Sequence, residues 1–185
     1  MRKLASFLLI ILLLSAGCTP SDPVLAEWAD HEILQSYVEN YKTTLGASGV
    51  TEFPSDYEIT VELVENTILL DEAERLGLTA TEEEIESMIQ SSEEAYELPA
   101  GKEFLDSYCA AVGITVEEYF TLLREQLPKT IARQKLKDHI GRTYCEENGL
   151  EFTKMNPPQA MLDAVDQYIA ELVEQAGVTY QINED

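Results

Sequence analysis

The stretch GLTATEEEI, residues 77–85, predicts a sharp corner between two helices. Gly77 favours the left-handed backbone conformation that ends a helix. Thr81 is suited to cap the next helix, because Glu84 follows three residues later and can accept a hydrogen bond from the backbone N–H of Thr81. The stretch GITVEEY, residues 113–119, repeats the order of glycine, apolar residue, threonine and acid. The sequence therefore predicts two tight helix–helix corners.

Apolar residues at helical spacing predict helices on both sides of these corners. Pro128 lies inside the long fifth helix and is expected to kink or divide it. We expect the third helix to end at about Ser91 and Ser92. After Gly141 we expect the chain to lack regular secondary structure. The expected limits are about residues 25–41, 55–77, 81–92, 104–112, 115–140 and 159–177.

The last residues of the chain predict a short strand, because Val178, Tyr180 and Ile182 alternate with polar residues. A strand needs a partner, and the extended piece around Leu25–Trp28 is the only obvious candidate. The expected fold is mainly α: a bundle of about six helices with a closing C-terminal helix and a minimal two-stranded pairing of the chain ends.

The N-terminus has the pattern of a secretory signal. Arg2 and Lys3 precede the apolar run Phe7–Leu14, which is short for a membrane span. The residues LSAGC (14–18) resemble the bacterial lipobox, in which the cysteine receives a diacylglyceryl group and becomes the first residue of the mature chain. We expect a signal peptide at 1–17, lipid attachment at Cys18 and an extracytoplasmic protein anchored to the cell membrane. The alternative is a plain secreted protein in which Cys18 is incidental.

The charge of the chain excludes several partners. Removal of residues 1–17 takes away two of the 12 basic residues and none of the 35 acidic ones, which changes the formal net charge from −23 to −25. Nucleic acid and anionic lipid are therefore poor partners. The segment Arg124–Arg142 is locally basic. Ion pairing within the molecule is the favoured interpretation of this segment, and anion binding is the alternative.

The sequence offers no catalytic constellation. Cys109 and Cys145 are either a disulfide or, as we favour, two buried thiols, and neither belongs to a CxxC pair. His31 and His139 have no metal-ligand spacing around them. The acids at the helix starts, Glu82, Glu83, Glu117 and Glu118, suit the helix dipole better than a carboxylate site. We therefore expect no enzyme, no metal site and no cofactor.

Two long segments, LLDEAERLGLTATEEEIESMI (69–89) and FLDSYCAAVGITVEEYFTLLREQLPKTIARQKL (104–136), resemble the N-terminal chaperone module of the SurA/PrsA extracytoplasmic foldases. LAEWADHEILQSYV (25–38) resembles its opening strand, turn and helix, and YIAELVEQAGVTYQI (168–182) its closing helix and strand.

The lipobox-like cysteine and the proline-containing residues after it predict a lipidated tether at 18–24. The resemblance implies one helical module formed by 25–140 and 159–185, and a short connection at 141–158. The family usually carries a parvulin prolyl isomerase domain at that connection, and about twenty residues are too few for such a domain. Isomerase activity is therefore not expected.

The function implied by this resemblance is a chaperone that holds unfolded or secreted polypeptides in an apolar groove beside the membrane. No residue is assigned to client binding. Five adaptable side chains are candidates for either groove or core: Tyr37, Tyr41, Met88, Tyr96 and Met161. The alternative function is a scaffold or adaptor lipoprotein that binds one folded partner protein.

Overall fold

The computed structural model describes residues 22–183, and this part of the chain is mainly helical, as predicted. It contains six helices and one small sheet. The elements in chain order are β1 (Val24–Trp28), β2 (His31–Leu34), α1 (Gln35–Ala47), α2 (Asp56–Arg75), α3 (Glu82–Tyr96), α4 (Pro99–Val112), α5 (Val116–Asn148), α6 (Gln159–Ala176) and β3 (Thr179–Tyr180).

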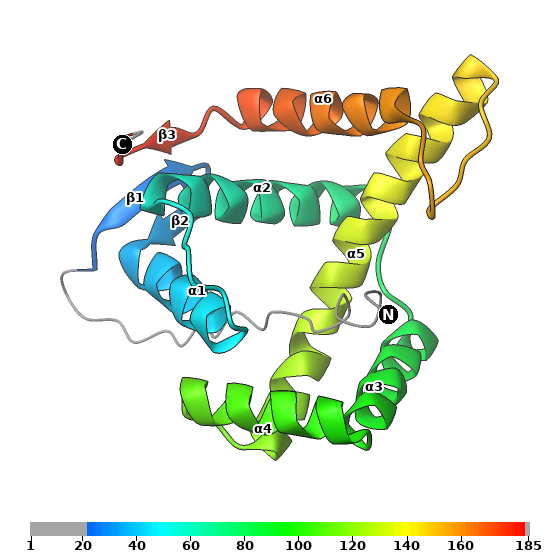
Figure 1. Cartoon of the computed structure of the whole chain (residues 1–185). Helices are drawn as coiled ribbons and strands as arrows, with labels where there is room; N and C mark the ends of the chain where they lie inside the picture. Colours follow the sequence, from blue (N-terminus) through cyan, green and yellow to red (C-terminus); the bar gives the residue numbers. More distant parts are fainter. Residues whose placement is uncertain (1–21, 184–185) are drawn as a thin grey trace.

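The helices are arranged as a frame (Figure 1). α2 and α6 run side by side, and α5 crosses one end of both. α3 and α4 pack on the first half of α5, while α1 lies beneath the sheet at the opposite end of α2. α4 also reaches back to α1. The helices α1, α2, α5 and α4 therefore form four sides of a closed ring.

The sheet joins the two ends of the fold. β1 is central and pairs antiparallel with β2 on one side and with β3 on the other. Ala26 lies opposite Tyr180, which confirms the expected pairing of the chain ends. The helical pattern expected over residues 25–41 is wrong over its first ten residues, whereas the extended piece expected at Leu25–Trp28 is confirmed as part of β1. A turn with a positive φ of 45° at Ala29 leads into a second strand, β2, which was not expected.

Both predicted corners are present and are closed by reciprocal capping boxes. The backbone N–H of Glu84 donates to Thr81 Oγ1 at 3.3 Å, and the N–H of Thr81 donates to Glu84 Oε2 at 2.8 Å. Thr115 and Glu118 make the same pair of bonds at 3.1 and 2.7 Å. Each box satisfies backbone donors that a helix start leaves free.

Several predicted helix limits are wrong. α3 continues through Ser91 and Ser92, whose hydroxyls donate to carbonyls one turn earlier. α4 starts at Pro99, where proline is tolerated because the first helical N–H has no partner in the helix. α5 is continuous through Pro128, so a division there is wrong.

The connection between the last two helices is shorter than the predicted 141–158. α5 extends past Gly141 to Asn148, and α6 begins at Gln159. Gly141 is a buried helical residue whose missing side chain leaves room for Met161: a Cβ there would lie 3.1 Å from the Met161 sulfur. The glycine is therefore a packing position and not a helix end.

Three clusters of buried side chains form the core. The sheet cluster joins β1, β2, α1 and the first half of α2. The α3–α5 cluster joins α3, α4 and the first half of α5. The junction cluster lies where α2 crosses α5 and contains Leu69, Ala73, Ala132 and Leu136.

Cys109 and Cys145 are both free and buried, which confirms the preferred interpretation of these residues as apolar core positions. Cys109 belongs to the α3–α5 cluster, and burial raises the pKa of its thiol. Cys145 lies near the far end of α5.

Replacement of a corner threonine should destabilise the fold. Thr81→Ala removes the acceptor for the Glu84 N–H, and we expect a loss of about 1 kcal/mol in the free energy of unfolding. Thr121→Ala is the matched control, because the Thr121 hydroxyl donates to the carbonyl of Glu117 within a helix and caps nothing. Urea unfolding followed by circular dichroism measures both. Equal losses for the two variants would contradict a capping role for Thr81.

Candidate functional site

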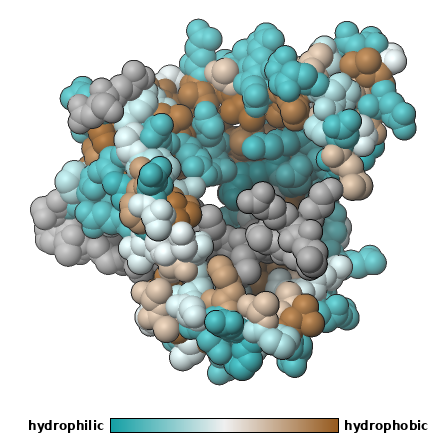
Figure 2. All heavy atoms as spheres, in the orientation of Figure 1, coloured by the Kyte–Doolittle hydropathy of each residue, from teal (hydrophilic) through white to brown (hydrophobic). Residues whose placement is uncertain are grey.

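The inside of the helical frame is the first of two candidate regions. Figure 2 shows a recess directly below α2, on the side toward α5. The wall visible below α2 is coloured as hydrophilic. We call this region the central hollow.

Polar groups from three helices of the frame lie near one another. Burial and the neighbouring carboxylate of Glu62 on α2 raise the pKa of Tyr41 on α1. Burial lowers the pKa of the Arg133 guanidinium on α5, and the nearby carboxylate of Glu62 opposes this shift. Arg133 donates to Thr130 Oγ1 at 3.3 Å and has no carboxylate within 4.0 Å among residues 22–183. This part of the frame therefore brings together polar groups from α1, α2 and α5.

The structure does not bring the five candidate residues together. Tyr41 and Met161 are buried core residues. Tyr37 is half-buried against the sheet cluster, and Met88 and Tyr96 are half-buried against the α3–α5 cluster. These five side chains do not form a common surface.

Large apolar side chains are exposed elsewhere, and sequence reasoning did not single them out. Three of them lie on the connection between α5 and α6 and the first turn of α6, which we call the α5–α6 corner. They are Leu150, Met155 and Leu162, with exposed fractions of 40%, 91% and 37%. Figure 2 shows hydrophobic atoms at this corner of the molecule. The remaining ones are dispersed: Val50 and Phe53 before α2, Leu76 after it, and Leu98 before α4.

The corner is fixed to α5 by the residues around its exposed side chains. The Phe152 ring lies under the Arg142 guanidinium, 4.2 Å from ring centroid to Cζ. Phe152 and Met161 both contact the surface of α5 at Gly141. The exposed apolar side chains therefore belong to a segment that is packed against α5.

Few side chains of α6 are buried against the rest of the molecule. Of its 18 residues only Met161 and Val165 are buried. One polar contact ties its middle to α2: the Tyr168 hydroxyl donates to Glu72 Oε1 at 2.8 Å. Glu72 is 7% exposed and also accepts two bonds from Arg75, at 2.5 and 2.7 Å. The hydrogen bonds from Arg75 and Tyr168 lower the pKa of the Glu72 carboxyl.

Part of the basic segment pairs within the molecule, as expected. Arg124 of α5 forms an ion pair with Glu86 of α3. Lys135 donates to Glu84 Oε2 at 2.6 Å and to the Thr79 carbonyl at 2.8 Å. These contacts link α5 to the first corner. The anion-binding alternative has no support from these two residues.

Searches of protein-family models, of curated proteins and of solved structures returned no match to this chain. The resemblance to the SurA/PrsA module therefore stays a prediction. Within residues 22–183, no helix is both long and apolar enough to span a bilayer, and no three His, Cys, Asp or Glu side chains are grouped as metal ligands. The predicted signal peptide 1–17 and Cys18 lie outside the described residues.

Glu72 should make stability depend on pH. Its folded pKa lies below the unfolded value of about 4.3, so its contribution is complete at neutral pH and is lost as the pH falls through the folded pKa. We expect Glu72→Gln to lower the free energy of unfolding by about 1–2 kcal/mol at pH 7. The difference from the wild type should shrink below pH 4.

Urea unfolding at a series of pH values measures this difference. Glu74→Gln is the control, because Glu74 is an exposed residue on the same helix. Its effect should stay within about 0.5 kcal/mol. A Glu72→Gln penalty that is constant from pH 7 to pH 3 would show that the ionised carboxylate does not stabilise α6.

Proposed function

We propose that this chain is a membrane-anchored extracytoplasmic chaperone, which binds unfolded or newly exported polypeptides without catalysis. The observation that carries the proposal is the α5–α6 corner, with three exposed apolar side chains on an ordered support. The resemblance to the SurA/PrsA chaperone module, the secretory signal and the lipobox-like residues 14–18 favour the same function.

The chemistry of the corner suits weak, sequence-tolerant binding. Methionine is flexible and polarisable, so Met155 can adapt to side chains of different shapes. Leu150 and Leu162 add apolar area that an extended polypeptide can cover. Such contacts are non-directional, so they do not select one sequence. The acidic surface, at a formal net charge of −23, keeps the protein soluble and disfavours acidic clients.

Lipid attachment is tested in a bacterial host that is fed an alkyne fatty acid. The full-length chain should become labelled and sediment with membranes, because an acylated Cys18 holds it on the bilayer. Cys18→Ser should lose both the label and the membrane association. Cys145→Ser is the control, since that thiol is buried in the fold and should not affect labelling. Labelling of the Cys18→Ser variant would overturn the predicted attachment site.

Client binding is tested by the aggregation of a chemically unfolded protein in the presence of the mature chain. We expect suppression at near-stoichiometric ratios. Replacement of Leu150, Met155 and Leu162 by serine should reduce the suppression severalfold. The matched control replaces three exposed apolar residues that lie elsewhere, Val50, Leu76 and Leu98. Equal loss in both triple variants would contradict a localised surface, and no suppression by the wild type with several clients would overturn the proposed function.

A second function is favoured by one observation: three of the exposed apolar residues lie within one connection and the helix turn that follows it. Exposed apolar side chains on a segment packed against α5 also suit an adaptor lipoprotein that binds one folded partner. Affinity capture from solubilised membranes separates the two functions. One stoichiometric partner favours the adaptor, whereas many unfolded polypeptides favour the chaperone.

A further inference from the structure

The first described residues of the chain lie immediately beside α1. The side chain of Asp22 accepts a hydrogen bond from the backbone N–H of Ser36 at 3.1 Å, and the Pro23 carbonyl accepts one from the N–H of Gln35 at 2.9 Å. The N-cap residue of α1, Leu34, offers no side-chain cap. Asp22 and Pro23 therefore supply acceptors that the start of a helix needs, and the two residues are part of the fold.

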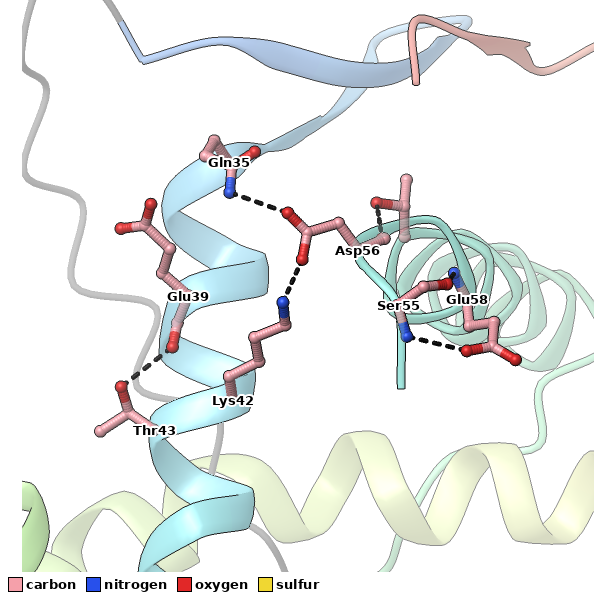
Figure 3. Close-up of polar contacts among 8 residues, drawn as sticks. Gln35, Glu39, Lys42, Thr43, Ser55, Asp56 and Glu58 are labelled. Atoms are coloured by element: carbon pink, nitrogen blue, oxygen red, sulfur yellow. Dashed lines mark hydrogen bonds and ion pairs between the residues drawn. The ribbon is translucent and has the colours of Figure 1, made fainter. Parts of the chain in front are cut away.

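Asp22 and Pro23 lie at an end of the molecule where polar contacts join α1 to α2. Asp56 at the start of α2 accepts from the side chain of Gln35 at 3.3 Å and forms an ion pair with Lys42 (Figure 3). The same end carries the three-stranded sheet. We call this region, formed by the sheet and the first turns of α1 and α2, the sheet end.

The length of chain between Cys18 and the sheet end is short. Only Thr19, Pro20 and Ser21 separate Cys18 from Asp22. Four Cα–Cα steps span at most about 14 Å when fully extended. A lipid attached at Cys18 therefore cannot place Asp22 far from the membrane surface.

The α5–α6 corner is remote from the sheet end. β3 follows α6 directly and pairs with β1, so the C-terminal end of α6 lies at the sheet end and its N-terminal end lies at the corner. An α-helix of 18 residues is about 27 Å long. The two ends of α6 can thus lie at different distances from a bilayer.

We propose that the sheet end is a membrane-facing surface, held against the lipid headgroups by the short tether, and that the α5–α6 corner points away from the bilayer. This inference rests on the proposed lipid attachment at Cys18. The surface makes no adhesive contact of its own with anionic lipids, because Glu27, Asp30, Glu32 and Glu39 are exposed there. Basic side chains on and beside the sheet end are paired within the molecule: His31 of β2 with Asp71 in the second half of α2, and Lys42 of α1 with Asp56.

The test couples the mature chain through Cys18 to maleimide lipids in phosphatidylcholine vesicles that contain a dansyl lipid. Cys109 and Cys145 are buried, so coupling is directed to Cys18, and Cys18→Ser must not couple. Chemical coupling separates the geometry tested here from the question of whether cells acylate Cys18 and from client binding.

Energy transfer from tryptophan to the dansyl lipid measures the distance of each end from the bilayer. The only tryptophan, Trp28, is replaced by Phe. A new tryptophan then replaces either Glu39 near the sheet end or Met155 at the corner, both exposed. We expect severalfold more transfer from Glu39→Trp than from Met155→Trp. Equal transfer, or more from the corner, would overturn the proposal.

A second measurement leaves the core intact. Native Trp28 is retained, and 12 Gly/Ser residues are inserted between Ser21 and Asp22. The insertion lengthens the tether by about 20 Å on average. The insertion should reduce transfer from Trp28 severalfold. Unchanged transfer would overturn the role of the short tether. Strong transfer from the uncoupled protein would also overturn it, because the sheet end would then bind lipid by itself.

Discussion

Close packing of α2 against the middle of α5 is the contact on which the rest of the molecule depends. The junction cluster contains two small residues, Ala73 and Ala132, between the larger Leu69 and Leu136. Small side chains allow the two helix backbones to approach closely, and the leucines on either side fill the space around the crossing. The sheet and α1 are attached to one arm of this crossing, and α3 and α4 to the other. Without it, the two large clusters would be linked mainly by α6, which packs on both α2 and α5, and by α1 and α4, which touch on the opposite side of the frame.

The sequence predicted the corners well and the helix ends poorly, for a physical reason. A capping box depends on residues within one turn, so Thr81 and Glu84 could be recognised from their spacing alone. The course of α5 through Pro128 and Gly141 depends on distant residues. Buried Leu127 and Ile131 hold the helix on either side of the proline, and Met161 fills the space beside the glycine. The strand β2 was missed because Ile33 fits both a helical stripe and a strand that faces the sheet cluster.

The candidate surface was missed for a related reason. Leu150, Met155 and Leu162 look like ordinary apolar residues in the sequence, and only the fold decides that α5 and α6 leave them uncovered. In contrast, Tyr41 and Met161 were reasonable candidates that the fold uses in its core. A residue type indicates what a side chain can bind, whereas its exposure depends on tertiary packing.

The charge distribution explains why exposed apolar groups are compatible with a soluble fold. Arg124 and Lys135 neutralise acids at the first corner, but surface pairs of this kind contribute only about 0–1 kcal/mol each. Most acidic side chains have no basic partner, because the chain has 35 acidic and 12 basic residues. Their mutual repulsion between molecules opposes self-association through the α5–α6 corner. A flexible, weakly charged polypeptide would not meet this repulsion, which is consistent with the proposed binding of such a chain at the corner.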